Sequence, residues 1–321
     1  MWHNLFGSKF KIEIWGASHT PEIGVRISGV PQGIALLEED FEADLSRRRA
    51  SAKGTTARHE KDIPTIVSGV EGGVTTGETI EIVFQNGDTR SSDYSQFENH
   101  NRPSHVDFTA RAKYGSEVDL RGSGQFSGRM TVLLVAAGVV AKKVVEGVEY
   151  KTSIVEIGGS RNETEFSEIV AAAMHDGDSV GGVVECCAKG VKVGLGEPFF
   201  DSAESIISHL MFSVPAVKGV EFGSGFEGVR LRGSERNDCF VDGEGHTGES
   251  LHDVLRRLPT GWVFGVVVIT VHRQAVAADE VIAVAVIIPV FRAHIVVTDA
   301  VLQTGLVQND VLVRIGAVTG V

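Results

Sequence analysis

Two histidines lie in segments whose residue types suit proton transfer. His19 lies within 16–20 (GASHT), directly after an alternating segment, and His105 lies between Pro103 and Asp107. Histidine titrates near neutral pH without help, so both side chains are candidate general acids or bases. The alternative is that each is an ordinary residue on a surface loop.

Basic residues gather in two segments, although the whole chain has a net charge of −12. The loop 46–59 holds five of them and no acidic residue: Arg47, Arg48, Arg49, Lys53 and Arg58. The glycine-rich segment 121–129 (RGSGQFSGR) begins and ends in arginine and precedes an apolar stretch. Free N–H groups at a helix start and bidentate guanidinium groups both bind phosphate. These segments predict a site for a multiply anionic small substrate; a solvated helix end and a structural turn are the alternatives.

Metal and nucleophile chemistry have weaker support. The chain has no His-x-x-x-His or Cys-x-x-Cys pair, so no metal site is predicted. The spacing does not exclude a Ser-His-Asp triad, but no Gly-x-Ser-x-Gly elbow precedes a helix. The three cysteines are an odd number and two are adjacent, which favours a reducing compartment over a disulfide framework.

The hydrophobic pattern predicts the elements that must position these groups. Strands are predicted at 10–15, 25–30, 79–84, 179–187, 217–222, 266–271 and 281–290, and helices at 38–49, 131–145, 165–174 and 202–212, with Thr164 as the N-cap of the third. Strands and helices mix without a βαβ rhythm, and no linker separates two parts. We therefore expect an α+β fold in a single domain, 1–321.

Composition excludes several classes of protein. Hydrophobic residues make up 42% of the 321 residues, which is ample for a core and argues against disorder. The acidic balance argues against a nucleic-acid partner. Apolar stretches end before the roughly 18 residues of a membrane span, and residues 1–11 lack a signal-peptide pattern. We expect a cytoplasmic protein with no membrane partner.

Taken together, the motifs resemble those of the chorismate synthase family over about 5–240. The motifs that carry the likeness are 16–20, 47–49, 55–60 (TTARHE), 88–94 (DTRSSDY), 102–107 (RPSHVD), 113–115 (KYG), 121–129, 177–181 (GDSVG), 194–198 (GLGEP), 216–221 (AVKGVE) and 233–238 (GSERND). Departures from the family's pattern are Ala17, Thr20, Ser123 and Met130. The family's later motifs are not recognisable in 241–321, so no site residue is assigned there.

The resemblance implies an α+β sandwich of antiparallel sheets and helices, assembled as a homotetramer. It implies a carbon–oxygen lyase that eliminates phosphate from 5-enolpyruvylshikimate 3-phosphate to give chorismate, with reduced FMN as cofactor. NADPH would enter only indirectly, as a source of reduced flavin. An inactive flavin-binding relative and an unrelated phosphate hydrolase are the alternatives.

The resemblance also assigns roles to individual residues. His19 and His105 would be the catalytic acids, one toward the leaving phosphate and one toward the flavin. Substrate anions would be held by Arg48, Arg102 and Arg129, and the flavin would be lined by Ser18, Phe126, Ser127 and Gly128. Arg48 is expected to be an exposed loop charge, so the fold should survive Arg48→Ala. The same substitution is expected to weaken substrate binding by about 1.5–3 kcal/mol.

Overall fold

The computed structural model describes residues 4–49, 58–89, 94, 97, 100–103, 105–116, 118–145, 147–189, 191, 195–235, 240–241, 244–245, 268–269 and 312–315. The strand predicted at 281–290 lies outside these residues.

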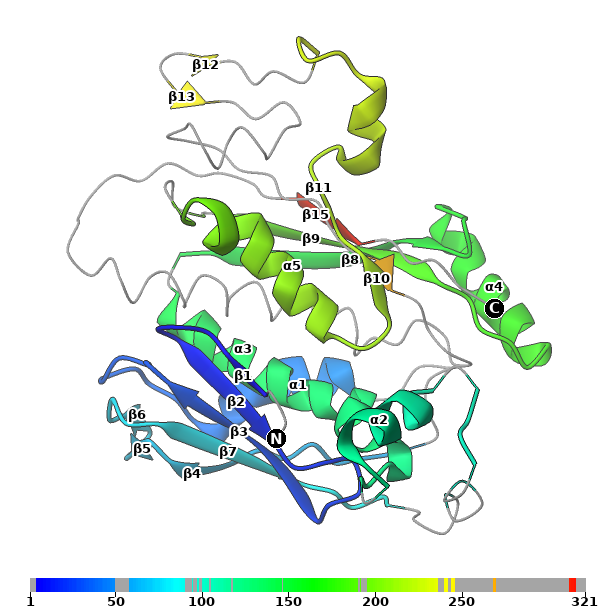
Figure 1. The fold of residues 1–321 in the computed structure, drawn as a ribbon. Coiled ribbons are helices and arrows are strands. Elements are labelled where there is room, and N and C mark those ends of the chain that lie inside the picture. Colours follow the sequence, from blue (N-terminus) through cyan, green and yellow to red (C-terminus); the bar gives the residue numbers. More distant parts are fainter. Residues whose placement is uncertain are drawn as a thin grey trace.

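A five-stranded antiparallel sheet forms one outer layer (Figure 1). Its strands, in spatial order, are β1 (Leu5–Phe6), β2 (Lys11–Trp15), β3 (Glu22–Ser28), β7 (Ile80–Gln85) and β4 (Thr65–Ser68). A short hairpin, β5 (Val70–Glu71) and β6 (Val74–Thr75), follows β4. In β3 the fully buried Ile23, Val25 and Ile27 recur at every second residue, while the intervening Arg26 is exposed. The period of two therefore turns one face of this sheet toward the core.

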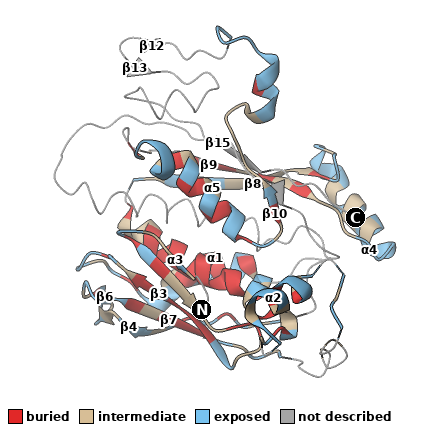
Figure 2. Ribbon diagram, in the orientation of Figure 1, coloured by how far each residue is buried: buried red, intermediate tan, exposed pale blue. Residues whose placement is uncertain are grey.

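Two helices cover that face. The 3₁₀ turn η1 (Glu38–Phe41) leads into α1 (Glu42–Arg48), which packs on α3 (Thr131–Val144), and α3 packs on β3. Residues 131–141 of α3 are all buried, as Figure 2 shows in red. Lysines in its last turn suit the negative end of the helix dipole, and they pair with Asp44 and Asp40 at 2.7 and 2.6 Å.

A second antiparallel sheet lies on the other side of the helices (Figure 1). Its central strand β9 (Gly182–Lys189) pairs with β8 (Glu149–Ile157) on one edge and with β14 (Val268–Ile269) and β15 (Leu312–Ile315) on the other. Beyond these, β10 (Val217–Gly219) pairs with β14 and β11 (Glu221–Phe222) pairs with β15, while β12 (Phe240–Val241) and β13 (Glu244–Gly245) form a separate pair. The helix α5 (Ala203–Ser213) contacts β10 and adds Ile207 and Leu210 to the core. The α+β sandwich is confirmed.

One run of helix, Arg121–Val144, is long and apolar enough to span a membrane, yet 78% of its most apolar window is buried within the structure. It joins η3 (Arg121–Phe126), η4 (Gly128–Met130) and α3 across a kink at residues 122–124. Here it serves as the core helix between the two sheets.

One predicted helix start is correct and another is wrong. Ser202 caps α5, because its hydroxyl accepts from the N–H of Ser205 at 3.2 Å. Thr164 does not cap the next helix upstream. The cap is Asn162, whose side-chain oxygen accepts from the N–H of Thr164 at 3.3 Å and from its hydroxyl at 2.9 Å. The asparagine oxygen thus starts η5 (Glu163–Glu165) and then α4 (Phe166–His175).

The turn before β10 carries a strained alanine. Val217 N–H donates to the carbonyl of Val214 at 3.4 Å around Pro215, and Ala216 has φ +70°. Proline followed by a positive φ is the type II pattern, which favours glycine at the third position. We expect Ala216→Gly to raise the free energy of unfolding by about 0.5–1 kcal/mol.

Denaturant titration of both forms measures this change. As a control, Ala172→Gly in the middle of α4 introduces glycine where φ is helical, so it is expected to lower stability by about 0.5–1 kcal/mol. Loss of stability in both variants would contradict the strain assigned to Ala216.

Candidate functional site

The turn after β2 brings His19 against the glycine-rich segment. The hydroxyl of Thr20 accepts from the N–H of Ala17 at 2.9 Å and donates to its carbonyl at 2.7 Å, which closes the turn. The N–H of Ser18 donates to the carbonyl of Gly124 at 3.0 Å. Ser18 is fully buried as a result, and the next residue, His19, faces the same segment.

The ring of His19 packs against Gly122, in a space that any larger residue at 122 would fill and that we call the Gly122 cradle. A side-chain carbon on Gly122 would come within 2.5 Å of the His19 ring and 2.7 Å of Ser18 Oγ. The ring of Tyr94 meets the imidazole edge-on, with 5.0 Å between ring centres. Both ring nitrogens are buried, and neither has a hydrogen-bond partner among the described residues. Buried polar atoms are normally paired, so these two nitrogens are candidates for hydrogen bonds to a ligand.

Charges around His19 favour the neutral ring. Burial lowers the pKa of His19 most, and the guanidinium groups of Arg58 and Arg121 lower it further. Asp119 raises this pKa, and so does the nearby backbone of Arg121, whose geometry falls short of a hydrogen bond. The ligand-free site therefore disfavours the imidazolium, and bound anions are needed to favour it.

Arg48 and Arg129 converge on one buried carboxylate. Arg48 Nη1 lies 2.8 Å from Asp62 Oδ2, and Arg129 pairs with the other oxygen of Asp62. Arg48 also donates to the carbonyl of Gly128 at 3.2 Å, and Arg129 Nε donates to Asn86 at 2.9 Å. Burial lowers the pKa of Arg129, while Asp62 opposes that shift. Two guanidinium groups around one carboxylate leave a net positive charge inside the protein.

The expectation that Arg48 lies on an exposed loop is wrong. Its side chain is 9% exposed, at the C-terminal end of α1. The reason is a tertiary contact: the guanidinium of Arg48 forms a buried ion pair with Asp62, which is 14 residues away in sequence. An alanine at this position is therefore expected to lower stability as well as any binding.

Arg102 and His105 lie around the start of α2 (Asp107–Tyr114). Arg102 forms a bidentate pair with Asp107 at 2.8 and 2.7 Å, and these bonds raise the pKa of Arg102 and lower that of Asp107. His105 is exposed, with Nδ1 2.9 Å from the carbonyl of Pro103. The guanidinium of Arg102 lies 5.6 Å from the centre of the Tyr94 ring, which also contacts His19. Tyr94 thus joins the segments that carry the two histidines.

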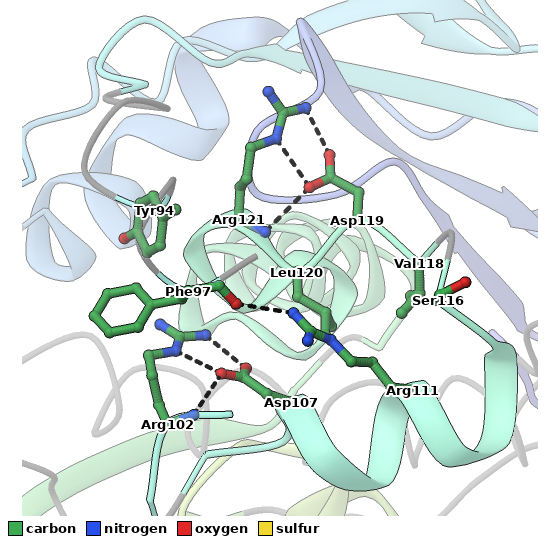
Figure 3. A pocket seen from close by; sticks show the side chains of 10 residues that line it. All are labelled: Tyr94, Phe97, Arg102, Asp107, Arg111, Ser116, Val118, Asp119, Leu120 and Arg121. Carbon is green, nitrogen blue, oxygen red and sulfur yellow. Dashed lines mark hydrogen bonds and ion pairs between the residues drawn. The ribbon is translucent and has the colours of Figure 1, made fainter. Parts of the chain in front are cut away.

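A cavity of about 330 Å³ opens beside this junction (Figure 3). Its lining residues are Tyr94, Phe97, Arg102, Asp107, Arg111, Ser116, Val118, Asp119, Leu120 and Arg121. Asp119 accepts from Arg121 Nε at 2.9 Å and from Nη2 at 2.7 Å, which lowers the pKa of Asp119. Arg111 donates to the carbonyl of Phe97 at 2.9 Å. Three arginines against two aspartates give the wall a net positive charge.

Of the predicted flavin-lining residues, Ser18 lies in the turn after β2, and Phe126, Ser127 and Gly128 lie where η3 meets η4. The hydroxyl of Ser127 accepts from the N–H of Arg129 at 3.3 Å and so caps η4. A carbon added to Gly128 would meet no atom within 4 Å, so the backbone is open there. Phe126 is 38% exposed and lies 6.4 Å from the ring of Tyr114. Their role toward a flavin stays a prediction.

The family departure at 123 has a visible consequence. Ser123 has φ +67°, between Gly122 at +55° and Gly124 at +57°. Three successive positive φ values suit three glycines, so the serine is strained where the family pattern has glycine.

Sequence reasoning missed several residues that the fold brings to the site. Arg58 belongs to the basic loop and to the motif 55–60, but neither pattern gives it a role of its own. Asp62, Asn86, Arg111 and Asp119 were not singled out at all. Asp62 and Asn86 pair with Arg48 and Arg129, which are distant in sequence, and a single chain carries no periodic signal for such pairs. Asp119 pairs with Arg121 two residues away, but nothing in the sequence places this pair in the wall of a cavity.

Known proteins similar to this chain agree on one family. The family model for chorismate synthase matches residues 10–253. A chorismate synthase of Chitinophaga pinensis is 50% identical over 245 residues, which are 76% of this chain and 73% of that protein. One of Korarchaeum cryptofilum is 42% identical over 270 residues, 75% of each chain.

A solved structure described as "Crystal Structure of Chorismate Synthase" shares the fold. It superimposes with a TM-score of 0.69 at 22% identity, over 91% of this chain and 93% of that one. The resemblance stated from the motifs is therefore confirmed, and with it the class of reaction, that of a lyase. By its family match and its sequence identity to these relatives, the chain belongs to the chorismate synthase family.

Proposed function

We propose that the protein eliminates phosphate from 5-enolpyruvylshikimate 3-phosphate, in the 1,4-anti sense, to give chorismate for aromatic amino-acid synthesis. In this step a C–H bond and the C–O bond to phosphate break, and the proton and inorganic phosphate leave. The observation that carries the proposal is the imidazole of His19, whose two buried nitrogens have no partner in the part of the chain that the structure describes, near an arginine-lined cavity.

The charge of the site suits this substrate, which carries a phosphate and two carboxylates. In the cavity wall, Arg102 and Arg121 are each paired with an aspartate, whereas Arg111 donates to the neutral carbonyl of Phe97. The Arg48–Asp62–Arg129 cluster adds a second net positive charge. Cations fixed before the reaction stabilise a developing phosphate charge by several kcal/mol when water is excluded.

The residues present fit reduced FMN. The open backbone at Gly128, the partly exposed ring of Phe126 and the nitrogens of His19, which no described residue bonds, are features that a bound group would use. Ser18, Phe126, Ser127 and Gly128 would hold it. Reduced FMN, when bound, supplies an electron-rich ring beside the substrate and is not consumed, because the elimination involves no net redox change.

The two histidines hold the protons in this proposal. Burial, Arg58 and Arg121 lower the pKa of His19 in the free protein, and the incoming anions raise it, so that its ring nitrogen binds a proton when the ligands arrive. His105, exposed at the start of α2, holds the second proton. One serves the leaving phosphate oxygen and the other serves the flavin.

Turnover with chemically reduced FMN under anaerobic conditions tests the proposal. We expect chorismate and phosphate to form in equal amounts. NADPH with oxidised FMN and no other reductant is expected to give no product, because the proposed enzyme depends on FMN that is already reduced. Flavin binding without turnover would favour an inactive relative, and phosphate release from simple esters would favour a hydrolase.

The proposal also includes the assembly and location of the protein. We propose a homotetramer of single-domain chains acting in the cytoplasm, without nucleic-acid or membrane partners. The net charge of −12 and the family membership support this. Light scattering of the purified protein measures the assembly, and a mass of one chain would contradict it.

A further inference from the structure

Arg58 grips the residue that precedes His19. Its Nη1 donates to Ser18 Oγ at 2.6 Å, and its Nη2 donates to the Ser18 carbonyl at 3.0 Å. Ser18 is fully buried, so both bonds are shielded from water. One planar guanidinium thereby fixes the side chain and the backbone of the same residue.

Glu60 holds Arg58 from its other edge. Its Oε1 accepts from Arg58 Nε at 2.9 Å and from Nη2 at 2.6 Å, and its side chain is 6% exposed. Its Oε2 accepts from the N–H of Gly87, just beyond β7, at 2.8 Å. The contacts therefore run from the C-terminal end of β7, through Glu60 and Arg58, to the His19 turn.

We propose that Arg58 is a positioning residue that acts through His19: it locks the Ser18–His19 turn so that the imidazole stays in the Gly122 cradle, and it fixes a positive charge beside the ring. For its catalytic consequence the inference rests on the proposed function. The geometry requires arginine, because a lysine ammonium lacks the planar fork that reaches Ser18 and Glu60 together.

The charge effect of Arg58 has a defined sign. Among the described residues, the groups that face His19 are Arg58, Arg121, Asp119 and the ring of Tyr94. Removing the Arg58 charge removes one of the causes that lower the pKa of His19, while burial and Arg121 continue to act. The pKa of His19 is therefore expected to rise in Arg58→Gln and to stay close to the wild-type value in Arg58→Lys.

Two measurements on the full chain test the inference. Titration of isotope-labelled histidine by NMR, with His19→Gln to assign the signal, reports the pKa of His19 without any substrate. In Arg58→Gln the signal is expected to titrate at higher pH than in wild type. Turnover at saturating substrate is expected to fall roughly 10- to 100-fold in both Arg58→Gln and Arg58→Lys, because the ring is misplaced. If His19 acts as an acid, activity is lost as pH rises through its pKa, so this limb moves to higher pH in Arg58→Gln alone.

Arg26→Gln is the matched control. Arg26 lies on β3, pairs with Glu81 at 2.9 Å and is 45% exposed, so neither readout is expected to move. An unmoved His19 titration in folded Arg58→Gln, or full turnover in Arg58→Lys, would overturn the inference. A wild-type chain without turnover, whose His19 titration still shifts in Arg58→Gln, would count against the proposed function while supporting the contact between Arg58 and His19.

Discussion

Replacing His19 by alanine is expected to lower turnover at saturating substrate by roughly 10²- to 10⁴-fold, the usual contribution of a general acid. The imidazole is held in the Gly122 cradle with both nitrogens unpartnered among the described residues, so its removal deletes a proton donor without breaking a hydrogen bond. Flavin and substrate affinity should therefore stay near the wild-type values. Stopped-flow turnover beside flavin titration makes the comparison.

His105→Ala is expected to have a loss of the same order, and His175→Ala is the control. His175 is 87% exposed at the end of α4 and lies 3.0 Å from Asp176, so full activity is expected. If the histidines only shaped the loops around the arginines, their loss would damage binding and leave saturated turnover unchanged. Equal harm from His175→Ala would remove the basis for the site assignment.

Several regular elements of the fold could be predicted from the sequence because their apolar residues are regularly placed. Apolar residues occupy every second position in β2, β3 and β7, and α3 is a nearly unbroken apolar run with two lysines in its last turn. The strand β8 was not predicted because most of its residues are half-buried, so its sequence does not show one apolar and one polar face. The helix α2 was missed because its sequence, DFTARAKY, is polar.

The sequence could predict which residues belong to the site, but it could predict only part of their arrangement. The motifs named His19, Arg102 and Arg129, and the structure gathers their segments through Tyr94 and Asn86. The burial of Arg48 could not be predicted, because it depends on the ion pair with Asp62. This pair forms only when the end of α1 packs against the segment that precedes β4. The same tertiary dependence hid Asp62.

Asp62→Asn is expected to lower the free energy of unfolding by about 3–5 kcal/mol, the range for breaking a buried ion pair on one side. Asp62 is 2% exposed, and its carboxylate is the acceptor shared by Arg48 and Arg129. Asparagine keeps the shape and tolerates the φ of +49° at this residue, so the change isolates the charge. Asp176→Asn, at a side chain that is 73% exposed, is the control and is expected to stay within about 0.5 kcal/mol of wild type.

A double variant shows whether the loss comes from the two guanidinium groups. Without the carboxylate, Arg48 and Arg129 repel each other in a buried site, so removing one of these charges relieves part of the penalty. Asp62→Asn combined with Arg48→Gln is therefore expected to be less destabilised than the sum of the single changes, by about 1–3 kcal/mol. Chemical denaturation of the four forms gives this coupling energy. Strict additivity would mean that the loss in Asp62→Asn does not depend on Arg48, and the ion pair between these two residues would then have no electrostatic role in the buried cluster.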